Sequence, residues 1–212
     1  MAILSYILIV LGGYLLGSIP FGYLVAKAKG IDIRSVGSGN IGATNAMRVL
    51  GKPAGIFVLA MDALKGYAAV WLAGVLVNKF NVNADFETLR VIAGIGAVLG
   101  HNYTCWLKFK GGKGIATTAG VYLALAPWAL LIAFTVFLLA VVITRYISVG
   151  SISGAVAVVI TVWVMMPQNL LLCIVTTALG ALAIYKHKTN IQRLMAGTEN
   201  RFGKKKSPEA NQ

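Results

Sequence analysis

Long segments without any charged residue are the feature of this sequence that most constrains its fold. Residues 1–26 contain no charge, and neither do residues 114–144. About 20 apolar residues are enough for a helix to cross the hydrocarbon core of a bilayer. The chain is 58% hydrophobic and 12% charged, about half the charged content of an ordinary soluble domain. We therefore expect an all-α integral membrane protein, which excludes a soluble globular domain.

The apolar stretches predict about seven transmembrane helices. They cover residues 1–26, 53–77, 91–107, 115–126, 128–144, 148–166 and 170–185. The first charges, Lys27 and Lys29, follow the first stretch, whereas a secretory signal peptide opens with positive charge. We therefore expect a retained first helix with its N-terminus outside the cell. Pro127 and the segment 166–169 are the expected turns between later helices.

Segment 114–144 forms either one long tilted helix or two helices broken at Pro127. With the break, 16 of the 19 Lys and Arg residues lie on the cytoplasmic side, together with the C-terminus. Without it, the basic residues divide between the two sides, so the positive-inside rule favours the break. At about 1.5 Å per residue, segment 115–126 gives only about 18 Å of helix, against a core of roughly 30 Å. A short or half-depth helix is expected there.

The same topology explains the formal net charge of +13. Nucleic-acid binding is not expected, because such proteins gather basic residues on soluble modules, whereas here charge-free runs separate them. We divide the chain into a single transmembrane helical domain, 1–200, and a basic polar cytoplasmic tail, 201–212. Cys105 and Cys173 are too few for a disulfide framework or a zinc site, and no metal or cofactor is expected.

Polar and glycine-rich residues form three clusters on the predicted cytoplasmic side. The first, residues 35–48, contains the pattern Gly37-x-Gly39-x-x-Gly42. A dinucleotide-binding fold is excluded, because no strand precedes the glycines and Asp62, about twenty residues on, lies within an apolar helix. Glycines also let backbone N–H groups approach an anion. The cluster is therefore either an anion-binding loop or a flexible connection between spans.

The second cluster, residues 100–118, places Lys113 between glycines at the start of the short helix. Gly114 and Leu107 stand where a Walker A motif needs Ser or Thr and Gly, so that motif is excluded. Free amides at a helix N-terminus beside a lysine and Thr117 predict a phosphate site. The third cluster, residues 186–201, has Asn190 and Arg193 on one helical face.

Several charged residues near these clusters have two interpretations. Lys108 and Lys110 fit membrane-surface anchors better than ligands, and His101 is either a base or a hydrogen-bonded structural residue. Asp62 and Lys65 lie three residues apart inside a span. Charges in a membrane usually pair and face a cavity, so these two either line a cavity or neutralise each other for packing. Glu199 either orients Arg193 or forms a surface ion pair, and the lysines at 204–206 fit a tail attracted to anionic lipid.

Four linked motifs resemble the bacterial PlsY family of membrane glycerol-3-phosphate acyltransferases. They are Gly-Ser-Gly-Asn-Ile-Gly-Ala-Thr-Asn at 37–45, Asp62-x-x-Lys65-Gly66, Gly100-His101 with Phe109-Lys110-Gly111-Gly112-Lys113-Gly114, and Asn190-Ile-x-Arg193-Leu with Gly197-Thr-Glu199. The resemblance covers nearly the whole chain, in order. One departure follows His101, where Asn102-Tyr103-Thr104-Cys105-Trp106 stands in place of an apolar residue and then Pro-Val, which leaves the role of Asn102 open.

The resemblance implies an acyltransferase that moves a fatty acyl group from acyl phosphate to the 1-hydroxyl of glycerol 3-phosphate. The products are lysophosphatidic acid and phosphate, in the first acylation step of phospholipid biosynthesis. It also implies a seven-helix fold in the bacterial cytoplasmic membrane, with the active site facing the cytosol and no nucleic-acid partner. The soluble acyl-phosphate synthase that supplies the donor is a candidate partner.

The motifs place the expected site residues. Those assigned to catalysis are Ser35, Arg48 and Lys113. Those assigned to substrate binding are Gly37, Ser38, Gly39, Asn40, Gly42, Thr44, Asn45, Lys65, His101, Gly112, Gly114, Thr117, His187, Asn190, Arg193 and Glu199.

The residue inventory is consistent with catalysis by charge and position. Five residues beyond His101 is Trp106, and five beyond His187 is Gln192, so the His-x4-Asp dyad of many glycerolipid acyltransferases is absent from the sequence. An acyl phosphate is already activated, so electrostatic stabilisation and positioning suffice. Two other functions would also use a basic face. A transporter for a phosphorylated solute would favour inverted repeats, which we do not find, and a lipid-binding protein would not need Lys113 or Arg48.

Overall fold

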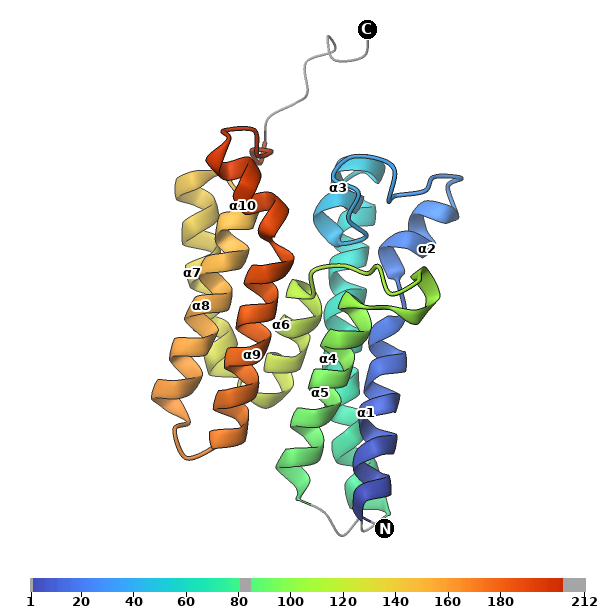
Figure 1. Cartoon of the computed structure of the whole chain (residues 1–212), viewed down its shortest axis with the longest axis vertical. Helices are drawn as coiled ribbons and strands as arrows, with labels where there is room; N and C mark the ends of the chain where they lie inside the picture. Colours follow the sequence, from blue (N-terminus) through green and yellow to red (C-terminus); the bar gives the residue numbers. More distant parts are fainter. Residues whose placement is uncertain (1, 81–84, 204–212) are drawn as a thin grey trace, which may run out of the picture.

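The computed structural model describes residues 2–80 and 85–203, which are all helical or irregular (Figure 1). One group of helices consists of α1 (Ala2–Ser18), α4 (Lys52–Lys79) and α5 (Phe86–Asn102), and a second of α7 (Pro127–Thr144), α8 (Ile147–Met165) and α9 (Leu170–Lys186). Between the groups lies α6 (Ile115–Leu125). Three short helices gather at one end of the bundle, α2 (Phe21–Lys27), α3 (Ala43–Leu50) and α10 (Lys188–Met195). The predicted all-α class is confirmed.

Several helices have the length and composition of membrane spans. Within the described residues, four are long and apolar enough, namely Ile3–Lys27, α4, α7 and α8. A fifth is added if α9 and α10, which meet at 51°, form one broken span. Their outward side chains are apolar, and Ile143 and Val164 are more than 70% exposed, as expected for a surface covered by lipid. The membrane fold is therefore supported, whereas the count of seven and the orientation stay predictions.

The predicted break at Pro127 is confirmed. α6 ends at Leu125, Ala126 separates the helices, and α7 begins at Pro127. Proline lacks the backbone N–H that a continuous helix would need at this point. The 11 residues of α6 span only about 16 Å, so the helix begins inside the protein, as the short segment 115–126 predicted.

A second break, at Pro20, divides the predicted first span into α1 and α2. It leaves the carbonyl groups of Ser18 and Ile19 without helical partners inside the bundle. The Thr104 hydroxyl donates to the Ser18 carbonyl at 2.6 Å, and the Lys65 ammonium donates to the Ile19 carbonyl at 2.8 Å. Interrupted helices persist in membranes when side chains satisfy the freed backbone groups. These two bonds therefore stabilise the break.

Some boundaries differ from the sequence prediction. The expected span 91–107 is α5, which begins at Phe86 and ends at Asn102, because the chain then folds into a loop containing a 3₁₀ turn at Cys105–Leu107. Helix α3 was not predicted and begins within the first cluster, directly after Gly42. Of the predicted tail 201–212, residues 204–212 lie outside the described residues, and residues 201–203 line the site described below.

Close packing of α4 on α6 sets the position of the short helix. A Cβ atom added to Gly66 would collide with the Thr117 carbonyl oxygen, and one added to Gly120 would collide with the Ala63 carbonyl oxygen. Small residues let membrane helices approach closely where no hydrophobic effect drives them together. The two glycines therefore fix the distance between α4 and α6, and with it the position of the α6 N-terminus.

Gly120→Val should destabilise the protein, because the added side chain meets backbone of α4 that cannot rotate away. We expect the midpoint of thermal unfolding in detergent to fall by about 5–10 °C, from an overpacking cost of about 1–3 kcal/mol. Gly12→Val is the matched control, since no atom lies within 4 Å of a Cβ at that position. Equal midpoints for the two variants would contradict the close packing of α4 on α6.

Candidate active site

The three polar clusters meet around one cavity of about 340 Å³ at the end of the bundle that carries α3 and α10. Thirteen of the predicted site residues line it: Ser38, Asn40, Gly42, Thr44, Asn45, Arg48, His101, Lys113, Gly114, His187, Asn190, Arg193 and Glu199. These residues come from the loop before α3, α3 itself, the end of α5, the loop before α6, and the α9–α10 region. Segments far apart in sequence thus form one polar site.

Asn45 organises the first glycine cluster. Its side-chain amide donates to the carbonyls of Ile33, Val36 and Asn40 at 2.9–3.2 Å, and its Oδ1 accepts from the Ser38 amide at 2.8 Å. The residue is 1% exposed. Gly37 and Gly39 adopt positive φ of +63° and +71°, which the tight loop requires. Asn45 therefore holds the shape of the loop.

Hydrogen bonds within this loop engage amides that were predicted to bind an anion. The amide of Gly39 donates to the Val36 carbonyl, and the amide of Gly42 donates to the Asn40 side chain at 2.8 Å. With the Ser38 amide also engaged, these groups are not free for a ligand. The uncapped N-terminus of α3, which begins at Ala43, is where this segment offers free amides to an anion.

The second cluster folds back on the end of α5. The amide of Gly112 donates to the His101 carbonyl at 3.0 Å, and the amide of Gly111 donates to the Asn102 carbonyl at 3.2 Å. A side chain at position 112 would collide with the His101 ring, and one at Gly114, where φ is +81°, would meet the Asn102 side chain. The glycines therefore let the loop lie flat on α5.

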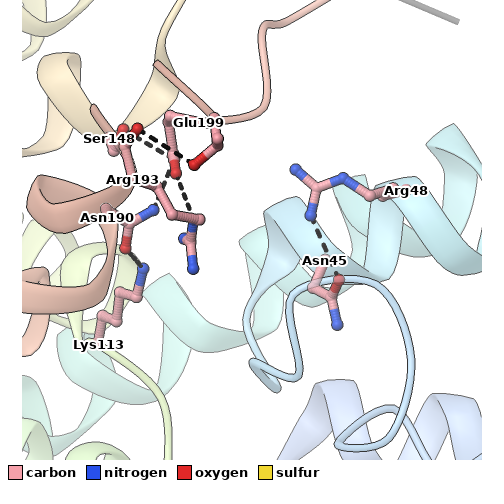
Figure 2. Close-up of polar contacts among 8 residues, drawn as sticks. Asn45, Arg48, Lys113, Ser148, Asn190, Arg193 and Glu199 are labelled. Carbon is pink, nitrogen blue, oxygen red and sulfur yellow. Dashed lines mark hydrogen bonds and ion pairs between the residues drawn. The ribbon is translucent and has the colours of Figure 1, made fainter. Parts of the chain in front are cut away.

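This flat loop carries Lys113 into the cavity, where its ammonium donates to the Asn190 side-chain oxygen (Figure 2). Burial, together with the neighbouring guanidinium of Arg193, lowers the pKa of Lys113 to about 8. The lysine is therefore mostly cationic at pH 7, and it loses its charge at a lower pH than an exposed lysine would.

Glu199 joins the third cluster to α8. Its carboxylate accepts from Arg193 Nε at 2.6 Å, from the Asn190 amide at 2.6 Å and from the Ser148 hydroxyl at 3.0 Å (Figure 2). Burial raises the pKa of Glu199, but these hydrogen bonds and the Arg193 charge outweigh it, so the net pKa is lowered. Of the two interpretations from the sequence, the geometry is that of a carboxylate that orients Arg193.

Arg48 faces this network from the opposite wall (Figure 2). It lies on α3, and its guanidinium donates to Asn45 Oδ1 at 3.4 Å. Half-burial lowers its pKa, yet arginine stays charged at any physiological pH. The cavity thus has Arg48 on one side and Lys113 and Arg193 on the other, with Arg201 also lining it. Cations outnumber the carboxylates of Asp62 and Glu199, so the cavity favours anions.

Asp62 and Lys65 form a buried pair, with Lys65 Nζ 2.8 Å from Asp62 Oδ1. Asp62 reaches the cavity, whereas Lys65 does not. The Lys65 ammonium also contacts His101 Nδ1 at 2.9 Å and the Ile19 carbonyl. Both interpretations from the sequence therefore hold in part, because the pair neutralises itself and one member lines the cavity.

Six predicted site residues lie away from the cavity wall: Ser35, Gly37, Gly39, Lys65, Gly112 and Thr117. Ser35 is exposed and donates to the Asp32 carbonyl. Gly112 lies behind Lys113 against His101, and Thr117 is fully buried. Ser148 is a site residue that sequence reasoning missed, because it stands in an apolar stretch. Its spacing of three residues from Ser151, which also lines the cavity, was the available signal.

An apolar cavity of about 200 Å³ adjoins the polar one. The two share five lining residues: Leu59, Ile115, Ala116, Phe137 and Ser151. From there the apolar cavity runs between α6, α7, α8 and α9 toward Tyr122 and Val158. Within the described ranges, no group of three or more His, Cys, Asp or Glu residues is arranged to hold a metal ion.

Comparison with known proteins agrees with this architecture. The sequence profile of the family described as "Glycerol-3-phosphate acyltransferase" matches residues 7–197. A glycerol-3-phosphate acyltransferase of Desulforamulus reducens is 48% identical over 206 residues, which cover 96% of this chain and 98% of the relative. The resemblance noted from the four motifs is confirmed.

Two solved structures share the fold. Both are crystal structures of PlsY (YgiH), an integral membrane glycerol 3-phosphate acyltransferase, in its glycerol 3-phosphate form and its lysophosphatidic acid form. They are 41% and 40% identical to this chain, with TM-scores of 0.84 and 0.81. Each match covers 94% of this chain and 96% of the other.

Glu199→Ala should destabilise the site end of the bundle, because Arg193, Asn190 and Ser148 lose their shared acceptor. The Glu199 side chain is 6% exposed, and removal of a carboxylate from such a network leaves buried donors unpaired. We expect the unfolding midpoint to fall by about 5 °C or more.

Glu87→Ala is the matched control for this variant. Glu87 forms an ion pair with Arg90, but its side chain is 52% exposed, and such surface pairs contribute about 0–1 kcal/mol. Its unfolding midpoint should fall by less than about 2 °C. A fall for Glu199→Ala as small as that of the control would show that the network does not stabilise the fold.

Proposed function

The chain belongs to the glycerol-3-phosphate acyltransferase family, and from this premise we propose that it uses acyl phosphate as its donor. It transfers the fatty acyl group to the 1-hydroxyl of glycerol 3-phosphate and releases lysophosphatidic acid and phosphate. This is the first acylation step of phospholipid biosynthesis. The protein acts in the bacterial cytoplasmic membrane with the cavity toward the cytosol.

The single observation that carries the proposal is the junction of a cationic cavity with an apolar one. An acyl phosphate has the same two parts, a charged phosphate and an alkyl chain. Cations on opposite walls, Arg48 on one and Lys113 and Arg193 on the other, also suit two phosphorylated substrates held together (Figure 2). A site for a wholly polar solute would not need the apolar extension.

The reaction needs one new bond and one broken bond. The 1-hydroxyl oxygen of glycerol 3-phosphate attacks the acyl carbonyl carbon, and the ester bond forms. The bond from that carbon to the phosphate oxygen breaks, and its electrons leave with the phosphate. The hydroxyl proton moves to a phosphate oxygen. Cations and helix amides stabilise the negative charge that gathers on the carbonyl and phosphate oxygens.

The cavity residues fit direct transfer better than a covalent enzyme intermediate. Four hydroxyl residues line the cavity, Ser38, Thr44, Ser148 and Ser151. Within the described residues, none of them forms a hydrogen bond with a histidine ring, since His101 contacts Lys65 and His187 contacts the Ala183 carbonyl. Burial, together with the nearby Lys113 charge, lowers the pKa of His187 to about 4, which makes this ring a weak base at pH 7. Holding both substrates in line lowers the activation free energy by several kcal/mol, and this effect needs no nucleophile from the protein.

The placement of basic residues supports a cytosolic cavity. Lys27, Lys29, Lys108 and Lys110 lie on α2 or in loops at the same end of the bundle as the cavity. Because basic residues accumulate on the cytoplasmic side of membrane proteins, this end faces the cytosol. The soluble acyl-phosphate synthase then reaches the site from the side on which it makes the donor.

Purified protein in lipid, given acyl phosphate and glycerol 3-phosphate without coenzyme A, should form lysophosphatidate and release an equal amount of phosphate. Lys113→Ala and Arg48→Ala should each lower kcat/KM at least about tenfold, because each removes about 1.4 kcal/mol or more of stabilisation. Lys79→Ala, at the far end of α4, is the control and should match the unmodified protein.

The alternatives predict different results in this assay. A transporter would form no product but would move a phosphorylated solute into vesicles. A lipid-binding protein would form no product and would be insensitive to Lys113→Ala. Either result would overturn the proposed donor and reaction.

The pH dependence of the reaction should depend on Lys113. Its lowered pKa of about 8 means that the cation is present below pH 8 and is lost as pH rises through 8. Activity should therefore decline above about pH 8. In Lys113→Arg the charge persists over the whole pH range of the assay, so the decline should disappear even if the maximal rate is lower. Steady-state rates between pH 6 and 10 measure this, and an unchanged decline in the arginine variant would contradict it.

A further inference from the structure

Lys65 directs its ammonium at three polar groups inside the protein, through two hydrogen bonds and one ion pair. Its ammonium has three N–H donors and no acceptor. Three acceptors lie within 2.9 Å, the Ile19 carbonyl, Asp62 Oδ1 and His101 Nδ1. Lys65 and Asp62 are only 3% and 2% exposed. The lysine is therefore fixed, and one of its bonds ends on a histidine that lines the cavity.

This contact determines which nitrogen of His101 carries the proton. Because an ammonium can only donate, Nδ1 must accept, and the ring proton lies on Nε2. The other candidate partner of Nδ1, Asp62 Oδ1, lies at 3.5 Å, beyond the ordinary range of an N–H···O hydrogen bond. The distances therefore favour the Nε2–H form.

The surrounding charges also keep His101 neutral. From α4, the Asp62 carboxylate is already balanced by Lys65. Lys113 lies in the loop packed on the ring, and Lys186 at the end of α9 donates to the Asn102 carbonyl at 3.1 Å. A protonated ring would therefore add a cation to a buried group whose single carboxylate is already paired.

The Nε2–H group is directed toward the loop that carries Lys113. A side chain at Gly112 would collide with His101 Nε2, so the ring edge lies directly against this glycine. No other group in the described part of the chain forms a hydrogen bond with Nε2. His101 itself lines the cavity, and its Nε2 is not among the fully buried polar atoms without a partner, so this donor is accessible from the cavity.

We propose that His101 is a fixed hydrogen-bond donor to a substrate oxygen and not a proton acceptor. Lys65 and Asp62 are positioning residues, which set its tautomer and do not touch substrate. This proposal rests on the proposed function, since the oxygen belongs to the acyl phosphate or to glycerol 3-phosphate. It also explains why Lys65, expected from the sequence to bind substrate, is buried away from the cavity.

His187 has the opposite tautomer and serves as an internal reference for His101. Its Nδ1 lies 2.8 Å from the Ala183 carbonyl, and a carbonyl can only accept, so here the proton lies on Nδ1. The chain contains two histidines. The two rings should therefore be neutral at pH 7 with opposite tautomers, which one spectrum can distinguish.

Nitrogen-15 NMR of the full chain in lipid, with labelled histidine, tests the tautomer without any assay of activity. We expect one Nε2–H ring and one Nδ1–H ring at pH 7, and His187→Gln should remove the second. In Lys65→Met the His101 Nδ1 loses its donor and lies near Asp62, so it should gain a proton. An Nδ1–H or doubly protonated His101 in the unmodified chain would overturn the proposal, and this result does not require Lys65→Met to fold.

Two replacements of His101 distinguish a hydrogen-bond donor from a ring that has only a structural role. The side-chain amide of glutamine offers an N–H near the position of Nε2, whereas leucine offers none. His101→Gln should retain activity within about tenfold of the unmodified protein, and His101→Leu should lose about tenfold more than the glutamine variant. Equal losses in both variants would overturn the donor role. If the unmodified protein forms no product, the proposed function fails, while the spectrum still reports the tautomer.

Discussion

The two hydrogen bonds and the ion pair of the Lys65 ammonium are the interactions on which the arrangement of the site depends. A charge inside an apolar bundle must be paired, and this one joins the break after α1, the middle of α4 and the end of α5. The bond to Ile19 stabilises the break at Pro20. The bond to His101 holds the ring on which the glycine loop lies, and this loop carries Lys113 into the cavity.

A second set of polar contacts, centred on Glu199, positions the cations of the anion site. Glu199 holds Arg193 and Asn190, and Asn190 in turn accepts from Lys113. The carboxylate thus orients Arg193, while Arg48 on the far wall forms no ion pair with a carboxylate of residues 2–80 or 85–203. Because α6 begins inside the protein, its N-terminus and the apolar cavity behind it meet at this point. The boundary between charged and apolar surroundings matches the two parts of the proposed donor, a charged phosphate and an apolar acyl chain.

Much of this architecture can be predicted from the sequence. The remainder depends on contacts between distant segments, which the pattern of apolar and polar residues does not reveal. The break at Pro127 was predictable, because proline and the charge distribution both require it. That three clusters share one face followed from the same topology. In contrast, Lys65 was expected at the substrate because a charge in a span is conspicuous, while its partner from the α1–α2 break is invisible in sequence. Likewise, the amides of Ser38, Gly39 and Gly42, which the glycine pattern offered to an anion, donate to acceptors within the loop and in Asn45. Ser148 was missed because it stands in an apolar stretch.

The central claim is that cations and position, and no nucleophile of the protein, bring about acyl transfer. Mixing the purified protein with acyl phosphate in the absence of glycerol 3-phosphate, and measuring phosphate release and the intact mass of the chain in the first turnover, tests it most directly. We predict no burst of phosphate and an unmodified mass. A burst of one phosphate per chain, together with an added acyl group, would show a covalent intermediate and contradict the account.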